Sequence, residues 1–262
     1  MRRPVVPVLL LVLTVFMPRG SFAQHCQSPA GSDSRQPGLR LELGVEAARY
    51  RTARYEGSYE GGYSAVTWKR ERWSASAMAP LYRLTRNGQR SLGMGDLLLA
   101  LTATLWRAEH ANTSAGLVIA ASLPTGSKEH GLGMGHAMLM PGVWGVWIAN
   151  RLTLQGQLSY GRALASGSAH HAGGPAPLVN PMNASEIEGA LTAAWELSNR
   201  VELRARMAGA APLADPQGEF RAIAGLGAAW RMGDVTLGFE GQFPLTGSPF
   251  TARALAMTSV LF

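Results

Sequence analysis

Methionine and histidine side chains gather in one short stretch of this 262-residue chain. Thioether sulfur and imidazole nitrogen are ligands that soft Cu(I) accepts, so the stretch is a candidate metal site. In an extended chain, side chains two residues apart share a face, and four of the candidates follow that spacing. The candidate ligands are His130, Met134, His136, Met138 and Met140.

An apolar packing role explains the same methionines. Met138 and Met140 would then form the lipid-facing side of one strand, together with Trp144 and Val146. We favour this interpretation over metal binding. The period of two does not decide between them, because Leu139 and its neighbours make the opposite face apolar as well.

Catalytic constellations are scarce. The chain has no Gly-x-Ser-x-Gly motif and no His-Glu-x-x-His motif, and it contains only four aspartates. Glu186 and Glu188 share a face, but such neighbours on a strand usually pair with Arg across the sheet. We therefore expect no enzymatic activity and no bound cofactor.

Apolar and polar residues alternate along much of the chain, which is typical of half-buried strands. Leu39 and Leu41 fall on one face, whereas Arg40 and Glu42 fall on the other. We predict twelve strands, although the second and third are joined by a poor turn at 68–73 and could be one strand. Their ranges are 39–54, 61–69, 72–85, 93–107, 113–123, 136–148, 152–164, 185–197, 200–211, 219–231, 234–243 and 251–262.

These features indicate an all-β fold, a transmembrane antiparallel up-and-down β-barrel. The strands are near the ten residues that a tilted membrane strand needs. Tight turns such as Asn150-Arg151 alternate with longer connections such as 124–135 and 165–184, as short periplasmic turns and long outer loops do in such barrels. The pair His170-His171 in the longest loop would add to an outer ligand site or, more commonly, be solvated.

The polar face of the strands carries both charge signs, which suits a lumen better than the core of a secreted β-sandwich, the main alternative. Sandwich cores also favour larger side chains than the Leu, Ala and Gly mixture on the apolar face. The expected lumen-lining residues are Arg40, Glu42, Glu46, Asp96, Glu186, Glu188, Glu202, Arg204, Arg206, Arg221, Glu240 and Arg253.

The N-terminus has the pattern of a cleaved signal peptide. Arg2 and Arg3 precede an apolar run, and Ser21-Phe22-Ala23 offers small residues where a signal peptidase cleaves. We expect a signal peptide over 1–23, a flexible periplasmic arm over 24–38 and a barrel over 39–262. The single cysteine, Cys26, excludes an intramolecular disulfide.

Charge and location restrict the partners. Without the leader, 21 basic side chains face 17 acidic ones, a net charge of +4, and an exported chain of this kind does not bind nucleic acid. Basic residues near the outer rim, such as Arg49 and Arg83, would meet anionic lipopolysaccharide in the outer-membrane lipid. The terminal Phe262 after alternating apolar residues is similar to the signal that the barrel-assembly machinery reads.

Two short motifs carry a resemblance to a family. Gly93-Met94-Gly95-Asp96-Leu97 is followed about thirty residues later by Leu123-Pro124-Thr125-Gly126-Ser127. This pair resembles the outer-membrane family labelled MetA-pathway of phenol degradation, with the pattern extending over 93–262. The resemblance implies a bacterial outer-membrane barrel that passes small, often aromatic or hydrophobic, compounds, and it carries over no catalytic residue.

The motifs also have a local physical meaning. Pro124 cannot donate to a strand ladder and Gly126 permits a positive φ, so Pro-Thr-Gly ends a strand. Gly93 and Gly95 permit a bulge, which would point Asp96 into the lumen. For Asp96 we favour a structural role, accepting turn amides or pairing with Arg, over solute contact.

Two functions follow as hypotheses. The first is a passive outer-membrane channel or uptake protein for small-molecule solutes. The second is a barrel whose lumen is closed by Glu and Arg pairs and which serves as a structural or ligand-binding surface protein, with a copper site as one form of it.

Overall fold

The computed structural model describes residues 37–51, 56–108, 112–164, 182–213, 218–247 and 250–262. The expected signal peptide, most of the expected arm and the pair His170-His171 lie outside these residues. The described residues contain no helix that is long and apolar enough to cross a membrane.

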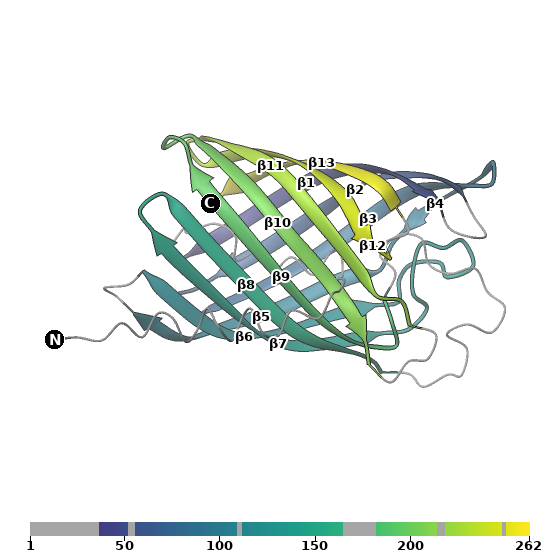
Figure 1. Cartoon of the computed structure of the whole chain (residues 1–262), viewed down its shortest axis with the longest axis horizontal. Helices are drawn as coiled ribbons and strands as arrows, with labels where there is room; N and C mark the ends of the chain where they lie inside the picture. The colour runs from purple at the N-terminus through teal and green to yellow at the C-terminus, as the bar shows by residue number, and fades with distance from the viewer. Residues whose placement is uncertain (1–36, 52–55, 109–111, 165–181, 214–217, 248–249) are drawn as a thin grey trace.

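The described residues form thirteen strands that follow one another around a single sheet. Figure 1 shows them in chain order. They are β1 (Gly38–Arg51), β2 (Glu56–Lys69), β3 (Trp73–Arg86), β4 (Gln89–Met94), β5 (Leu97–Ala108), β6 (Thr113–Leu123), β7 (Met138–Ala149), β8 (Leu152–Ala163), β9 (Ser185–Glu196), β10 (Val201–Pro212), β11 (Arg221–Met232), β12 (Val235–Thr246) and β13 (Phe250–Leu261).

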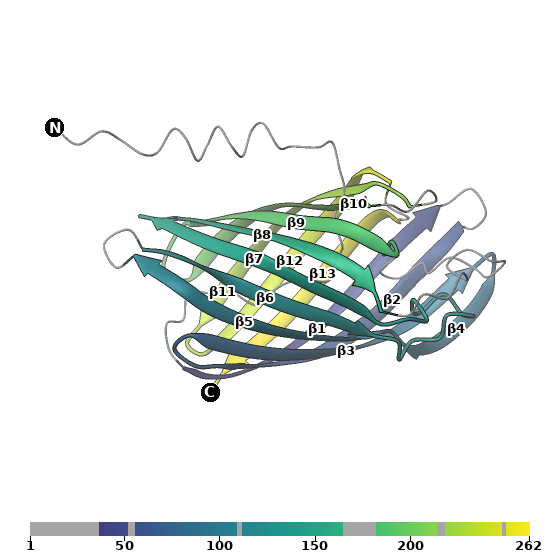
Figure 2. The same cartoon turned by 90° about the horizontal axis from the view of Figure 1, so that it is seen from below.

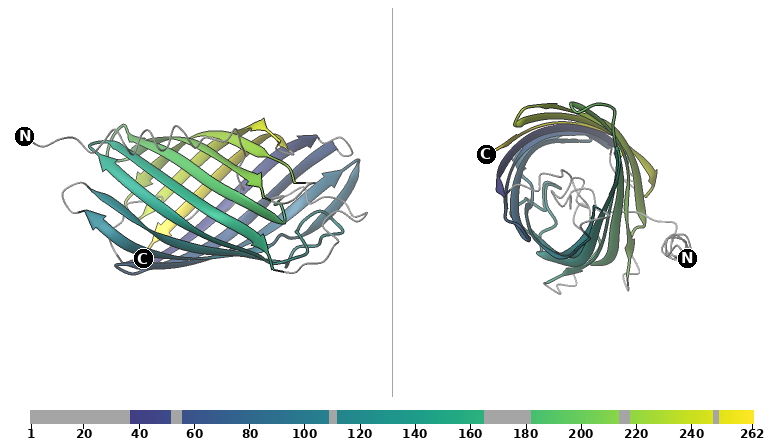
Figure 3. Two further views of the ribbon diagram at one scale, coloured as in Figure 1. Left: turned by 60° about the horizontal axis from the view of Figure 1, so that its bottom comes forward. Right: turned by 90° about the vertical axis from the view of Figure 1, so that its left-hand side faces the viewer.

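The sheet closes on itself because β1 pairs antiparallel with β13 on one side and with β2 on the other. The remaining side of β2 pairs with β3. One half of β3 pairs with β4 and the other half with β5, so these two short strands form one interrupted strand. The described wall is therefore a twelve-stranded antiparallel barrel, as predicted, and Figure 3 shows the closed ring in its right-hand view.

Closure gives each strand a neighbour on both sides, which a strand in lipid needs because no water is present to bond its backbone groups. Between β9 and β10 the register covers only Ala211–Ile187 and Pro212–Glu186, at the loop end of the two strands. The strands are strongly tilted in the barrel (Figure 2), as closure of a twisted sheet requires. The first and last strands meet at one end, where the amide of Leu39 donates to the carbonyl of Phe262 and the amide of Phe262 donates to that of Leu39.

The predicted alternation places apolar residues outside. In β1, Leu43 and Val45 are each 60% exposed, whereas Glu46 between the outward positions is 4% exposed. Exposed leucines and aromatics recur on the outer side of the other strands, among them Leu117, Leu226 and Phe239. An outer surface of this kind is the apolar band that faces lipid in a membrane barrel.

The two ends of the barrel differ in their connections. Asn150 and Gly233, with φ of 51° and 62°, occupy tight turns at the end that we call the short-turn end. The uncertain turn between β2 and β3 is also there, closed by a bond from the amide of Arg70 to the carbonyl of Trp73. The opposite end, here called the loop end, carries the segment 124–137. By the topology of outer-membrane barrels the short-turn end is periplasmic.

A charge on the outer face should destabilise the barrel according to its depth. Leu226 lies in the middle of β11 and Met232 at its short-turn end, and both side chains point outward. We expect Leu226→Arg to lower the free energy of unfolding in lipid vesicles by about 2–4 kcal/mol, and Met232→Arg by at most about 1 kcal/mol. Equal losses for the two variants in denaturant titrations would show that β11 does not span a bilayer.

Candidate functional site: the lumen of the barrel

The lumen at the short-turn end holds a cavity of about 970 Å³. Turn residues such as Arg70 and Asn150 form its mouth, and it extends to Trp144 and Gly225, midway along their strands. Seven threonines and three serines keep its wall polar and the side chains short. The arrangement leaves room for solutes at this end.

The cavity wall carries an excess of positive charge. Eight basic and five acidic side chains line it, so the formal net charge of the lining is +3. Several of the residues expected to line the lumen lie here. They are Arg40, Glu202, Arg204, Arg206 and Glu240.

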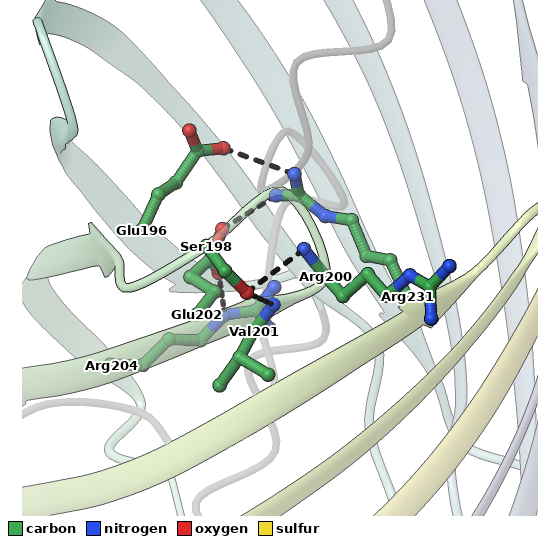
Figure 4. A network of polar contacts seen from close by, with 7 residues as sticks. All are labelled: Glu196, Ser198, Arg200, Val201, Glu202, Arg204 and Arg231. Atoms are coloured by element: carbon green, nitrogen blue, oxygen red, sulfur yellow. Dashed lines mark hydrogen bonds and ion pairs between the residues drawn. The ribbon is translucent and has the colours of Figure 1, made fainter.

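A network of ion pairs stands beside the turn between β9 and β10 (Figure 4). Arg231 reaches two carboxylates, Oε1 of Glu196 at 3.0 Å and Oε2 of Glu202 at 2.6 Å. Nε of Arg204 donates to the other oxygen of Glu202. Because the Arg231 side chain is 35% exposed, water screens these pairs and each contributes about 1 kcal/mol or less. Their main effect is to hold charged groups at the mouth of the cavity.

The lumen at the loop end is filled like a protein core. Tyr59, Tyr82, Leu84 and Phe250 are each at most 2% exposed and pack in one cluster, joined by Leu132 from the segment between β6 and β7. Tyr59 and Tyr82 meet edge to face, with ring centroids 5.8 Å apart. Large inward side chains therefore occupy the space that is open at the other end.

Buried polar groups brace this core. The Tyr82 hydroxyl donates to Oε1 of Glu46 at 2.7 Å, and Arg253 lies 3.4 Å from the other carboxylate oxygen. Nε of Arg253 donates to Oε1 of Gln242 at 2.8 Å. Nearer the short-turn end, the Tyr63 hydroxyl donates to Oε1 of Glu42 at 2.9 Å. These bonds involve five strands that follow one another in the wall, from β3 through β2, β1 and β13 to β12. Removing one partner of such a buried pair is costly, because the other partner is left buried without its bond.

A second buried network joins β9 to β11. Nη2 of Arg221 donates to Oε2 of Glu186 at 2.6 Å, which is the cross-sheet Arg partner expected for this carboxylate. Asn183 donates to the same oxygen and accepts from the amide of Glu219 at 2.8 Å. Glu188 is also buried, at 4% exposed. The predicted lining residues in the loop half are thus packed and bonded rather than water-facing.

Asp96 holds the segment 124–137 against the break between β4 and β5. Its Oδ1 accepts the amide of Gly126 at 3.0 Å and its Oδ2 accepts the amide of Met134 at 2.7 Å. Thr125 adds two bonds, donating to the carbonyl of Gly95 and accepting from the amide of Leu97. The interpretation that Asp96 accepts turn amides is confirmed.

The two sequence motifs therefore form one structural unit. Close approach explains their glycines: a Cβ on Gly126 would lie 2.7 Å from the carbonyl oxygen of Leu132, and one on Gly133 would lie 2.4 Å from Asp96. A Cβ on Gly93 would meet Leu132 itself at 2.9 Å. Without these side chains the segment folds over the interrupted strand and sends Leu132 into the lumen core.

The expected metal ligands are divided between the surface and the interior. Met134, Met138 and Met140 are at most 5% exposed and pack in one cluster with Met182, which sequence reasoning missed. His136 is buried at 8% exposed, with Nδ1 at 3.1 Å from the carbonyl of Met134. His130 is exposed, and its Nδ1 lies 2.8 Å from Oγ of Ser127.

The favoured interpretation of Met138 and Met140 as lipid-facing is wrong. Leu139, Pro141, Val143 and Trp147 are the exposed residues of β7, and Met138 and Met140 point into the lumen. Both faces of β7 are apolar, so the pattern within the strand does not indicate which face points into the lumen. No cluster of three or more His, Cys, Asp or Glu residues suited to a metal occurs in the described part of the chain.

Comparison with solved structures identifies the fold. No protein-family model and no curated protein matches the sequence. An outer-membrane channel from Pseudomonas putida F1 superposes with a TM-score of 0.68 at 11% sequence identity, covering 89% of this chain and 99% of that one. The chain has the fold of outer-membrane β-barrels.

Other barrels of this fold serve different purposes. The NanC porin matches with a TM-score of 0.53 at 10% identity, covering 86% of this chain and 98% of its own. The translocator domain of the autotransporter NalP from Neisseria meningitidis matches at 0.52 and 16% identity, covering 88% of this chain and 90% of that domain. At such low identity the outer-membrane barrel fold is shown and the function has to come from the site.

Removing the carboxylate of Asp96 should free the segment it holds. A hydrogen bond to a charged group contributes about 1.5–3 kcal/mol, and two are lost in Asp96→Ala. We expect the amides of Gly126 and Met134 to exchange hydrogen at least about tenfold faster, while strand amides keep their rates. Asp96→Asn retains one acceptor oxygen and should protect only one of the two amides.

Asp234→Asn in a short turn is the matched control, and it should leave both amides unchanged. Unaltered exchange at Met134 in Asp96→Ala would contradict the role given to this carboxylate.

Proposed function

We propose that this protein is an outer-membrane channel for small solutes and that the structure is its closed state. The observation that carries the proposal is the cavity of about 970 Å³, which runs from the short-turn end to the middle of a membrane-type barrel. A polar cavity with mixed charge is suited to hydrated solutes, because its side chains exchange hydrogen bonds with water at little cost. A barrel that served only as a scaffold would gain nothing from this space.

The gate in this proposal is the segment 124–137 at the loop end. It is attached through Asp96 and Thr125, whereas most neighbouring strands of the wall are held by long ladders of backbone pairs. Segments with few backbone bonds open at lower free energy than sheet strands. Displacement of this segment would withdraw Leu132 and Met134 from the packed lumen. A second opening would then form as wall side chains such as Tyr59 and Tyr82 rearrange into the space that the segment leaves.

The charge of the lining points to anionic solutes. A lining of +3 in a low-dielectric wall raises the local concentration of anions and lowers that of cations. Trp144, Val146 and Ile148 form an apolar strip along the same cavity, on the inner side of β7. Together they suit small carboxylates and phenolates with an aromatic or apolar body, in keeping with the resemblance to the phenol-degradation family.

A closed, ligand-binding barrel is the second candidate. The buried bonds among Glu46, Tyr82, Arg253 and Gln242 favour it, because they fix the inward side chains of four strands along one side of the lumen at the loop end. In that case the cavity would hold a ligand on the periplasmic side without passage. Conductance in planar bilayers separates the two candidates, since only the channel carries current.

We also propose how the barrel reaches the outer membrane and which lipid groups it contacts there. Export by a cleaved signal peptide and insertion by the assembly machinery would use the ends of the chain, where Phe262 is exposed after β13. Arg83, paired with Glu60 at the loop half, and exposed Arg49 are suited to contacts with lipopolysaccharide phosphates.

A measurement of ion selectivity tests both that the protein conducts and that the positive charge of the cavity lining favours anions. We expect purified protein in planar bilayers to show current steps and, in a KCl gradient, a reversal potential on the chloride side. Replacing both Arg70 and Arg72 by Glu changes the lining from +3 to −1 and should move the reversal potential to the potassium side.

The control makes the same charge change at the other end, by Arg51→Glu with Arg90→Glu, and should leave the selectivity for chloride in place. If well-folded protein never conducts in any of these forms, the closed ligand-binding barrel replaces the channel.

A further inference from the structure

Four thioether side chains converge inside the loop half of the barrel. Met134 comes from the segment 124–137, Met138 and Met140 from β7, and Met182 from the segment before β9. Their exposed fractions are 5%, 0%, 1% and 7%. Four of the eleven methionines of the chain thus meet in one buried cluster, from three separate segments.

His136 is buried in the same stretch of chain, between Met134 and Met138 in the sequence. Burial alternates from Met134 to Met140, with residues 134, 136, 138 and 140 buried and 135 and 139 exposed. The Nδ1 of His136 lies 3.1 Å from the carbonyl of Met134. A carbonyl oxygen only accepts, so Nδ1 carries the hydrogen, and the neutral ring then has its lone pair on Nε2. A histidine that donates one N–H to a backbone carbonyl is the form in which histidine usually binds metals.

Gly161 on β8 provides space in front of the thioethers. A Cβ there would lie 3.3 Å from Cε of Met138 and 3.5 Å from Cγ of Met140. The stem of Glu186 borders the same space, 3.4 Å from that position. The methionines are therefore assembled around a glycine, next to the Glu186 side chain whose carboxylate is paired with Arg221.

We propose that Met134, Met138, Met140 and Met182, together with His136, form a binding site for a soft monovalent metal ion, Cu(I) or Ag(I). Uncharged thioethers suit such an ion, because soft sulfur ligands select Cu(I) over harder metals and no proton has to leave to bind it. The buried position withholds water from the ion. His130, the fifth residue expected from the sequence, is outside this site because it lies on the surface with Ser127.

The site would also join the gate segment to the wall. Met134 belongs to the segment 124–137, whereas Met138 and Met140 belong to β7. A bound ion would therefore hold this segment in its folded position. This consequence rests on the proposed function, but binding itself does not, and the two are measured separately.

Leucine substitution separates coordination from packing. Leu matches Met in volume, so Met138→Leu with Met140→Leu should preserve the core while removing two ligands. We expect competition with a chromophoric Cu(I) chelator to show one ion per wild-type barrel in detergent. The double variant should bind at least about tenfold more weakly, since losing even an outer partner of a ligand costs about 10- to 100-fold.

The control replaces two methionines on the lipid side, Met207→Leu with Met232→Leu, and should bind as the wild type does. Heat-modifiable migration on gels checks the folding of each variant. Equal Cu(I) affinity of both double variants and the wild type overturns the proposal, as does a wild type that binds no ion.

Methyl resonances of methionine provide a measurement on the unaltered protein if the double variant fails to fold. In a barrel labelled with [methyl-¹³C]Met, titration with Ag(I) should shift four resonances and leave those of Met207 and Met232 in place. Single Met134→Leu and Met182→Leu variants, both outside the strands, assign two of the four. A uniform shift of all methyl signals, or none, contradicts the site.

Discussion

The packing of the loop half of the lumen depends on one carboxylate that accepts two backbone amides. Asp96 lies where the strand formed by β4 and β5 is interrupted, and it bonds to Gly126 and Met134 at the two ends of the folded segment. Because the strand is interrupted between β4 and β5, the Asp96 carboxylate can point toward the segment 124–137. The bonds in turn place Leu132 and Met134 in the two clusters that fill the loop half of the lumen.

The division of the lumen follows from side-chain size along the same strands. Inward positions near the loop end carry Tyr50, Tyr59 and Tyr82, which pack in one buried cluster and exclude water. Toward the short-turn end the inward positions carry Thr67 and Thr104, and the space between opposite walls stays open. A barrel of constant width is thereby filled at one end and hollow at the other.

Much of the fold could be predicted from the sequence because the strand pattern is local. The alternation in β1 and the turns at Asn150 and Gly233 need only neighbouring residues to be interpreted. The role of Asp96 could be predicted in the same way, since a carboxylate that follows Gly93 and Gly95 at the entry to a strand is suited to accept turn amides. The alternation predicts that the charged residues share the inner face of the sheet. It does not predict which of them lie in the filled half of the lumen and which lie in the hollow half.

The remaining features are tertiary. Which face of β7 points into the lumen depends on the neighbouring strands, because Leu139 and Met140 are similarly apolar. The sequence pattern therefore assigns the methionines to the wrong face. Met182 reaches the cluster only through the path of the chain into β9. The fold of segment 124–137 into the lumen rests on contacts between residues about forty positions apart, which no local pattern contains.

A reversible lock on this segment tests directly whether it is the gate. A Cβ on Gly93 would lie 2.9 Å from Cδ1 of Leu132, which makes Gly93→Cys with Leu132→Cys the pair to test for a disulfide between β4 and the segment. Cys26→Ser removes the native thiol, and mass spectrometry verifies that the disulfide has formed. We expect no current from the oxidised double variant in planar bilayers and current steps after addition of a reductant. Equal currents in the oxidised and reduced forms would show that the segment is not the gate.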